Sequence, residues 1–90
     1  MYPEFDPAKN AANVRKHGVS LIEGDGVLLD PLGLTVEDPT TEGEQRWQTI
    51  GMNSLGEVRV VVWAYRGEDI RLISVRKPEP TERRDYEEGS

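Results

Sequence analysis

The apolar run over residues 70–77 ends with Ser74 and Arg76, a hydroxyl and a permanent cation two positions apart. Successive side chains of a strand alternate between its two faces, so Ser74 and Arg76 are expected to point to one side, together with Ile70 and Leu72. A hydroxyl and a guanidinium at the rim of a sheet are well suited to bind an anion such as a phosphate. This pair therefore predicts an anion site at the end of the strand.

Three other groups of residues offer acid–base or charge chemistry. His17 is the only histidine, and it follows Lys16 at the end of a predicted helix, where the helix dipole favours a cation. Glu44 and Arg46 share one face of a predicted strand and offer a carboxylate base and a phosphate ligand. Tyr86, on a predicted C-terminal helix, offers a hydroxyl donor.

Each of these residues also has a purely structural explanation. A Lys-His-Gly sequence is a good helix end, and Glu44 with Arg46 is also typical of a solvated strand face. Ser74 can satisfy a backbone group, Arg76 can pair with a glutamate of the last helix, and Tyr86 can pack as a core aromatic. The residue types alone leave both explanations open.

The remaining sequence predicts an α+β domain that positions these residues. Asp6 and Pro7 are typical of a helix start, and Gly18 of a helix end. Short apolar runs separated by turn residues predict a four-stranded antiparallel sheet built from sequential hairpins. The expected N-terminal helices cover 8–17 and 21–29, and a C-terminal helix begins at Thr81; the helix over 21–29 is the weaker prediction because of Gly24 and Gly26. The expected strands cover 32–37, 44–52, 58–65 and 70–77. Phe5 is expected to open a short edge strand or to pin the N-terminus.

Length and composition restrict the possible function classes. Ninety residues predict a single domain over 1–90 with a small core. The absence of cysteine excludes a disulfide framework, a cysteine zinc site and a thiol nucleophile. The N-terminal residues lack the pattern of a signal peptide, and no run is long enough to span a bilayer, so a cytoplasmic protein without a membrane partner is expected.

The charge is strongly acidic overall but unevenly distributed. A net charge of -6 disfavours nucleic-acid binding by the surface as a whole. Residues 58–77, with five basic and two acidic side chains, carry a net charge of +3, whereas residues 31–57, with one basic and five acidic side chains, carry -4. The positive charge is therefore expected around Arg71, Arg76 and Lys77.

The order of short motifs along the chain resembles the BrnT family. These motifs are Phe5-Asp6-Pro7-x-Lys9, Asn13-x-x-Lys16-His17-Gly18-Val19, Asp30-Pro31, Glu44-x-Arg46, Thr49-Ile50-Gly51, Arg71-x-Ile73-Ser74-x-Arg76 and Glu82-Arg83-Arg84-x-Tyr86-Glu87. The resemblance covers nearly the whole chain. It implies a RelE-like fold and the toxin of a type II toxin–antitoxin pair, an endoribonuclease that inhibits translation by cleaving RNA.

The resemblance also implies site residues and partners. The implied catalytic residues are Lys16, His17, Glu44, Arg46, Arg76 and Tyr86, and the implied substrate-binding residues are Arg71, Ser74 and Lys77. In RNA cleavage the ribose 2′-OH is the nucleophile, so a base, cations and an acid suffice, and neither a metal nor a cofactor is expected. The implied partner is a ribbon-helix-helix antitoxin, similar to BrnA, in a 2:2 complex that contacts operator DNA only through the antitoxin.

Two other function classes stay open at this stage. The chain is alternatively a non-catalytic module that binds the antitoxin and takes part in repression of its own operon. It is otherwise a structural interaction domain without a nucleic-acid role, for which the acidic net charge is the best argument.

Overall fold

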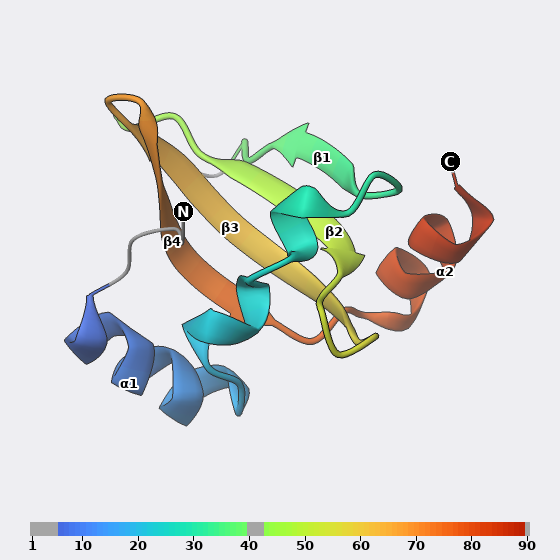
Figure 1. Ribbon diagram of the computed structural model, residues 1–90, viewed down its shortest axis with the longest axis horizontal. Helices are drawn as coiled ribbons and strands as arrows, with labels where there is room; N and C mark the ends of the chain where they lie inside the picture. The colour runs from blue at the N-terminus through green and yellow to red at the C-terminus, as the bar shows by residue number, and fades with distance from the viewer. Residues whose placement is uncertain (1–5, 40–42, 90) are drawn as a thin grey trace.

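A computed structural model describes residues 6–39 and 43–89 and confirms the predicted α+β class. Its elements, shown in Figure 1, are α1 (Pro7–His17), the 3₁₀ helices η1 (Leu21–Gly24) and η2 (Val27–Leu29), β1 (Leu34–Glu37), β2 (Trp47–Met52), β3 (Val58–Arg66), β4 (Asp69–Arg76) and α2 (Pro80–Glu88). Phe5, expected to form an edge strand or to pin the N-terminus, lies outside the described residues.

Helix α1 begins and ends where the sequence predicts. The Asp6 carboxylate accepts a hydrogen bond of 2.8 Å from the Ala8 N–H, and Pro7 occupies the first turn, where its missing N–H costs nothing. Gly18 ends the helix at φ 74, a conformation that glycine adopts without strain. The helix end therefore holds His17 at a fixed place beside the sheet.

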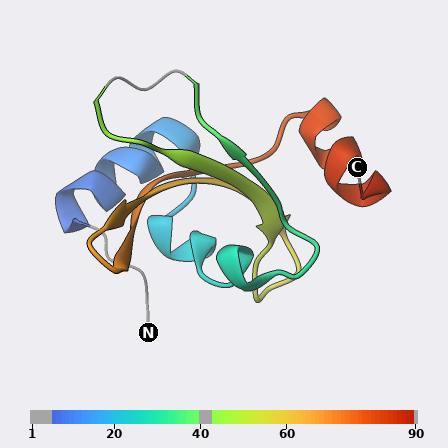
Figure 2. The same ribbon diagram turned by 90° about the horizontal axis from the view of Figure 1, so that it is seen from above.

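The strands form one antiparallel sheet in the order β1-β2-β3-β4. Figure 2 shows η1 and η2 on one side of this sheet and α1 and α2 on the other. We call the side toward η1 and η2 the core face, because the buried cluster packs there; it consists of Val19, Leu21, Val27, Val61, Trp63, Leu72 and Val75. The opposite side is the outer face, to which the strand register assigns Gln48, Ile50, Val60, Val62, Arg71, Ser74 and Arg76.

A β-bulge in β4 changes the alternation of its side chains. Trp63 pairs with Leu72, but the neighbouring Val62 pairs with Ser74, so Ile73 is an extra residue in the ladder. Such a residue shifts every following side chain to the other face. The bulge lies directly before the predicted anion site.

The prediction that Ile70 and Leu72 share a face with Ser74 and Arg76 is therefore wrong, and Ile70 packs against the core cluster. Leu72 is 2% exposed and packs in the core together with Val75. Strict alternation holds only in a strand without a bulge. The bulge instead brings Arg71 onto the same face as Ser74 and Arg76.

The segment predicted as one helix over 21–29 forms two separate 3₁₀ helices, with Gly26 at φ 86 between them. Gly24 is also required by packing, because a Cβ there would lie 3.0 Å from Val75 Cγ2 and 3.3 Å from Val61 Cγ2. Glycine thus lets η1 lie directly on the sheet. Close approach to the core face, rather than helix propensity, explains this glycine.

Several element boundaries differ from the prediction by one to three residues. Strand β1 begins at Leu34, because the Gly33 N–H donates to Asp30 O and closes a turn before it. Strand β2 begins at Trp47 instead of residue 44. Helix α2 begins at Pro80, with a capping box between Glu79 and the residue three positions later, so Thr81 is not its cap.

One side chain of α1 closes the free edge of β4. Asn13 is 6% exposed; its Nδ2 donates to Val75 O and to Val19 O, both at 2.8 Å, and its Oδ1 accepts from the Val75 N–H at 3.2 Å. The amide thus pairs with the β4 backbone as a neighbouring strand would. These bonds fix α1 against β4.

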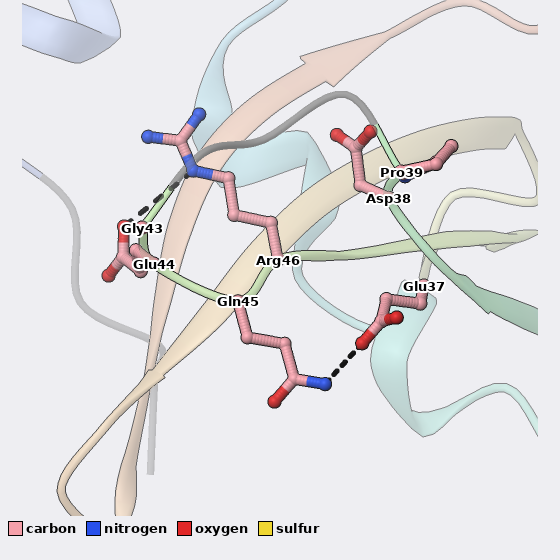
Figure 3. A pocket seen from close by; sticks show the side chains of 7 residues that line it. All are labelled: Glu37, Asp38, Pro39, Gly43, Glu44, Gln45 and Arg46. Carbon is pink, nitrogen blue, oxygen red and sulfur yellow. Dashed lines mark hydrogen bonds and ion pairs between the residues drawn. The ribbon is translucent and has the colours of Figure 1, made fainter.

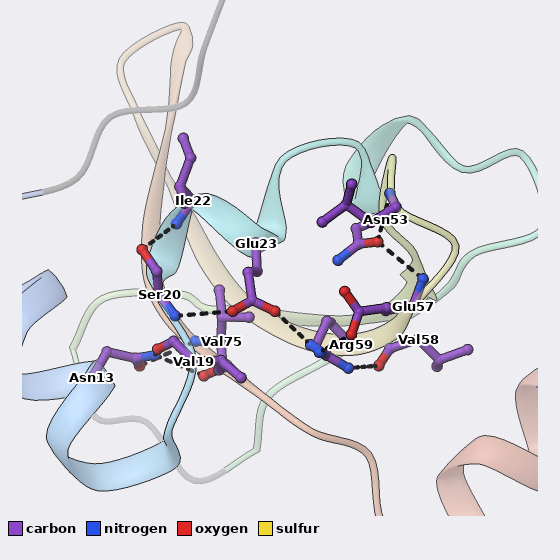
Figure 4. A network of polar contacts seen from close by, with 11 residues as sticks. Asn13, Val19, Ser20, Ile22, Glu23, Asn53, Glu57, Val58, Arg59 and Val75 are labelled. Atoms are coloured by element: carbon purple, nitrogen blue, oxygen red, sulfur yellow. Dashed lines mark hydrogen bonds and ion pairs between the residues drawn. The ribbon is translucent and has the colours of Figure 1, made fainter.

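A buried arginine ties η1 to β3 on the core face (Figure 4). Arg59 is 8% exposed and donates to Glu23 at 3.0 Å, to Glu57 at 2.7 Å and to the carbonyl of Val58 at 2.9 Å. Glu23 in turn accepts from the Ser20 N–H in the cap of η1. The guanidinium of Arg59 therefore has a structural role.

Candidate functional site

A groove between α1 and β4 brings together the residues predicted at the helix end and at the strand end. It has a volume of about 250 Å³, and Lys9, Asn13, Lys16, His17, Ile73 and Ser74 line it. Two elements that lie far apart in the sequence thus form one site, and the Asn13 bonds to Val75 hold them together. The extra residue of the bulge is part of the groove wall.

His17 lies in this groove in an environment that disfavours its charged form. Desolvation first, and then the positive charges of Lys16 and Arg76, lower the pKa of His17 below its ordinary value of 6.5. The ring is therefore predominantly neutral at pH 7. A neutral imidazole beside cations is suited to accept a proton from a substrate hydroxyl.

A titration of His17 tests this electrostatic arrangement. We expect NMR signals of its ring to report a pKa below 6.5, and Lys16→Gln to raise that pKa because a neighbouring positive charge is removed. Arg84→Gln, a change on α2, is the control and leaves it unchanged. Because the pKa is lower in the folded than in the unfolded chain, His17 also reduces stability as the pH falls below 6.5 and through the lowered pKa. A pKa at or above 6.5 would contradict the arrangement.

Arg76 lies on the outer face and is held by the last helix. Its Nη1 and Nη2 donate to the two carboxylate oxygens of Glu82 at 2.7 and 2.8 Å. This bidentate bond lowers the pKa of Glu82 and raises that of Arg76. The alternative that Arg76 pairs with a glutamate of the last helix is thus confirmed. The planar carboxylate occupies the position that a phosphate would take on the same guanidinium.

Glu44, Arg46 and Arg71 form a second cluster on the outer face. Arg71 Nη2 lies 2.8 and 2.9 Å from the two Glu44 oxygens, and Arg46 Nε lies 3.6 Å from Glu44 Oε2. Figure 3 shows the Glu44–Arg46 pair beside a pocket of about 340 Å³ at the start of β2. The Nε atoms of both arginines are buried and have no hydrogen-bond partner among the residues that the structure describes.

The register separates this cluster from Arg76. Arg71 pairs with Ala64 and Arg76 pairs with Val60 of the same strand. Four residues of β3 correspond to about 13 Å along the sheet. The sequence-predicted cations therefore form two groups on one face, with Ser74 between them.

Tyr86 lies apart from the groove residues and fixes α2. Its hydroxyl donates to Asp30 Oδ2, which also accepts from the backbone N–H of Met52. The hydrogen bond from Tyr86 lowers the pKa of Asp30, and the same bond raises the pKa of Tyr86. Lys77, directly after β4, is exposed, and its carbonyl accepts a bond of 3.3 Å from Arg76.

Much of the positive charge of residues 58–77 is neutralised by ion pairs in the structure. Arg59, Arg71 and Arg76 of that segment are all paired with carboxylates. Within residues 6–39 and 43–89, the cations without an ion pair are Lys9, Arg15, Lys16, Lys77 and Arg84. Two of these, Lys9 and Lys16, line the groove beside His17. Sequence reasoning missed Lys9, since only the fold brings it beside Ser74.

Two further observations concern membrane spans and metal binding. None of the helices that the structure describes has the length and apolar character of a membrane span. No three histidine or acidic side chains of the described residues come together in a way that would hold a metal ion. Trp47 and Trp63 pack on each other, with ring centroids 6.1 Å apart.

Comparison with known proteins identifies a family. The model of a family described as the ribonuclease toxin BrnT of type II toxin–antitoxin systems matches residues 5–82. No curated protein matches the chain. The matched range contains α1, the whole sheet and the first turn of α2, and so includes the groove and both arginine clusters.

Proposed function

The chain belongs to the BrnT family of ribonuclease toxins of type II toxin–antitoxin systems, and on this premise we propose that it cleaves RNA at the α1–β4 groove without a metal ion. The observation that carries this proposal is the convergence of unpaired cations with the single histidine in one groove. RNA phosphates are attracted to positive charge, and the rest of the surface is acidic. The groove is the part of the described surface best suited to them.

The proposed chemistry divides among the groove residues His17, Lys16 and Ser74 and the nearby Arg76, which does not line the groove but acts on His17 through its charge. Neutral His17 accepts the proton of the ribose 2′-OH, which then attacks the adjacent phosphate. Arg76 and Lys16 stabilise the charge of the phosphorane, and Ser74 donates a hydrogen bond to a phosphate oxygen. Lys16 also donates a proton to the departing 5′-oxygen. The expected products are a 2′,3′-cyclic phosphate and a free 5′-hydroxyl.

The remaining predicted site residues receive supporting roles in this proposal. The Glu44–Arg46–Arg71 cluster and Lys77 contact phosphates on either side of the cleaved bond, since they lie on the same face or directly beyond β4. Glu44 is the second candidate for the base. Tyr86 positions α2, because its hydroxyl is bonded to Asp30.

The family implies an antitoxin partner. We further propose that this antitoxin is a BrnA-like ribbon-helix-helix protein in a 2:2 complex, that operator DNA is contacted through it, and that the pair acts in the cytoplasm. A single domain over residues 1–90 is part of the same proposal.

The test uses the purified chain and an RNA oligonucleotide in the presence of EDTA, with and without translating ribosomes. We expect cleavage that leaves a 2′,3′-cyclic phosphate, and no cleavage at a position that carries 2′-deoxyribose, because the internal nucleophile is then missing. Loss of activity in EDTA, or cleavage at the deoxy position, would contradict the mechanism.

The same experiment separates the second function class. In the free chain, Arg71 is bonded to Glu44 and Arg76 to Glu82. Arginines that are already paired with carboxylates are also compatible with a non-catalytic module that only binds the antitoxin. Tight binding of the antitoxin without RNA cleavage under either condition would favour that module and overturn the enzymatic proposal.

A further inference from the structure

The two edges of the sheet differ in the hydrogen bonds that their backbone groups make. At the edge of β4, the Asn13 amide of α1 bonds both backbone groups of Val75. Strand β1 forms the opposite edge, and in the part of the chain that the structure describes it pairs only with β2. An open edge is a template for another strand.

The backbone groups available on β1 follow from its register. The Asp38 N–H donates to Arg46 O at 2.9 Å, so this pair is hydrogen-bonded to β2. Bonded and non-bonded pairs alternate along an antiparallel ladder. Leu34 and Val36 therefore use their backbone groups within the sheet, whereas the N–H and C=O groups of Thr35 and Glu37 point away from β2.

The side chains along this edge are unusually apolar for a surface. Val36 is 62% exposed on β1, and Leu32 and Leu29, just before the strand, are 70% and 82% exposed. Exposed leucine and valine side chains next to an open edge favour a partner strand that carries apolar residues at alternate positions.

Carboxylates lie at both ends of the edge. Glu37 is the last residue of β1 at one end, and Glu87 and Glu88 line a pocket of about 330 Å³ with Leu32 at the other. Antiparallel pairing with a second copy of β1 would bring carboxylates of one end against those of the other. A strand with lysine or arginine side chains is instead complementary to them.

We propose that the antitoxin of this toxin adds one extended segment, with alternating apolar and basic residues, to the free edge of β1 as a fifth strand. The proposal rests on the antitoxin partner that the family implies, but not on the site of RNA cleavage. It places the antitoxin contact on the edge opposite to the α1–β4 groove.

Amide hydrogen exchange by NMR tests this placement in the complex of the full chain with the antitoxin encoded at the same locus. In the free chain, the Leu34 and Val36 amides are expected to exchange slowly and those of Thr35 and Glu37 rapidly. In the complex, Thr35 and Glu37 are expected to become protected at least about tenfold. Unchanged exchange at both residues would overturn the proposal. The same protection of Thr35 and Glu37 in a concentrated solution of the chain alone would also overturn the proposal, because the strand added to β1 would then belong to a second copy of the chain.

A matched pair of substitutions separates backbone pairing from charge. Glu37→Pro removes an outward N–H of an edge strand together with the carboxylate, whereas Glu37→Gln keeps that N–H and removes only the charge. We expect Glu37→Pro to weaken antitoxin binding about tenfold or more, and Glu37→Gln about threefold or less. Equal effects would show a contact by charge alone and overturn strand addition.

Folding and catalysis are controlled independently. Thermal unfolding of both variants checks that β1 is intact, and the exchange experiment on the unsubstituted chain decides the question if Glu37→Pro does not fold. None of these measurements depends on RNA cleavage. A chain that fails to cleave RNA but shows the protection would overturn the proposed chemistry and leave the interface standing.

Discussion

His17→Ala is expected to lower kcat for RNA cleavage by about 10²–10⁴-fold, because it removes the group that accepts the 2′-OH proton. The groove holds this imidazole beside Lys16 and Ser74, and burial together with two cations keeps it neutral at pH 7. The loss corresponds to about 3–5 kcal/mol of the activation barrier. Single-turnover cleavage of an RNA oligonucleotide measures it.

The pH dependence of the same reaction identifies the role of the residue. In the unsubstituted chain the rate is expected to rise with pH through the lowered pKa of His17 and then to level off. In His17→Ala and in His17→Gln this rise is expected to disappear, since neither side chain titrates there. Glutamine is the control for hydrogen bonding without proton transfer.

A helix-end role for His17 predicts a different result. In that case His17→Ala would lower the unfolding temperature but leave the activity of the folded fraction and its pH profile unchanged. Full activity in a folded His17→Ala chain would contradict the proposed base and point to Glu44, the second candidate for the base, whose Oε2 lies 3.6 Å from Arg46 Nε.

Arg59→Met is expected to lower the free energy of unfolding by about 3 kcal/mol, because it leaves two carboxylates without their cation in a largely buried network. The arginine side chain is 10% exposed, and its partners Glu23 and Glu57 are 26% and 46% exposed. Methionine keeps most of the aliphatic contact. For a domain of this size the expected fall in Tm is about 15 °C, measurable by calorimetry.

Arg83→Met is the matched control for this prediction. Its pair with Glu87 is 3.8 Å long and more than half exposed on both sides, so we expect a change of about 0.5 kcal/mol or less. The double variant Glu23→Gln with Arg59→Met should lose less than the sum of the single variants, because both remove the same interaction. Equal losses for Arg59→Met and Arg83→Met would show that the buried network contributes no more than a surface pair.

Much of the fold follows from local sequence signals. Asp6, Pro7 and Gly18 determine the limits of α1, and the turn residues separate strands that pair in sequence order. These signals act within a few residues, so a single sequence carries them. The α+β class and the position of His17 at a helix end were predictable for this reason.

The arrangement of charges was not predictable from the same signals. Glu44 is 27 residues away from Arg71, and Glu23 is 36 residues away from Arg59. Segment charge counts treat such arginines as free, although the fold neutralises them. The bulge at Ile73 is equally a result of packing against β3, and it decides which residues of β4 face the groove. The convergence of His17 with Ser74 in one groove is likewise a result of the fold, which the sequence alone did not predict.

The Asn13 bonds to Val75 also constrain when the toxin becomes complete during its synthesis. Helix α1 leaves the ribosome first, but the backbone that its amide pairs with lies 62 residues later. Until that part of the chain has been translated, a nascent chain has the histidine and the lysines without the opposite wall of the groove. A chain that is cut short before β4 therefore carries most of the charged residues of the site but cannot form the groove.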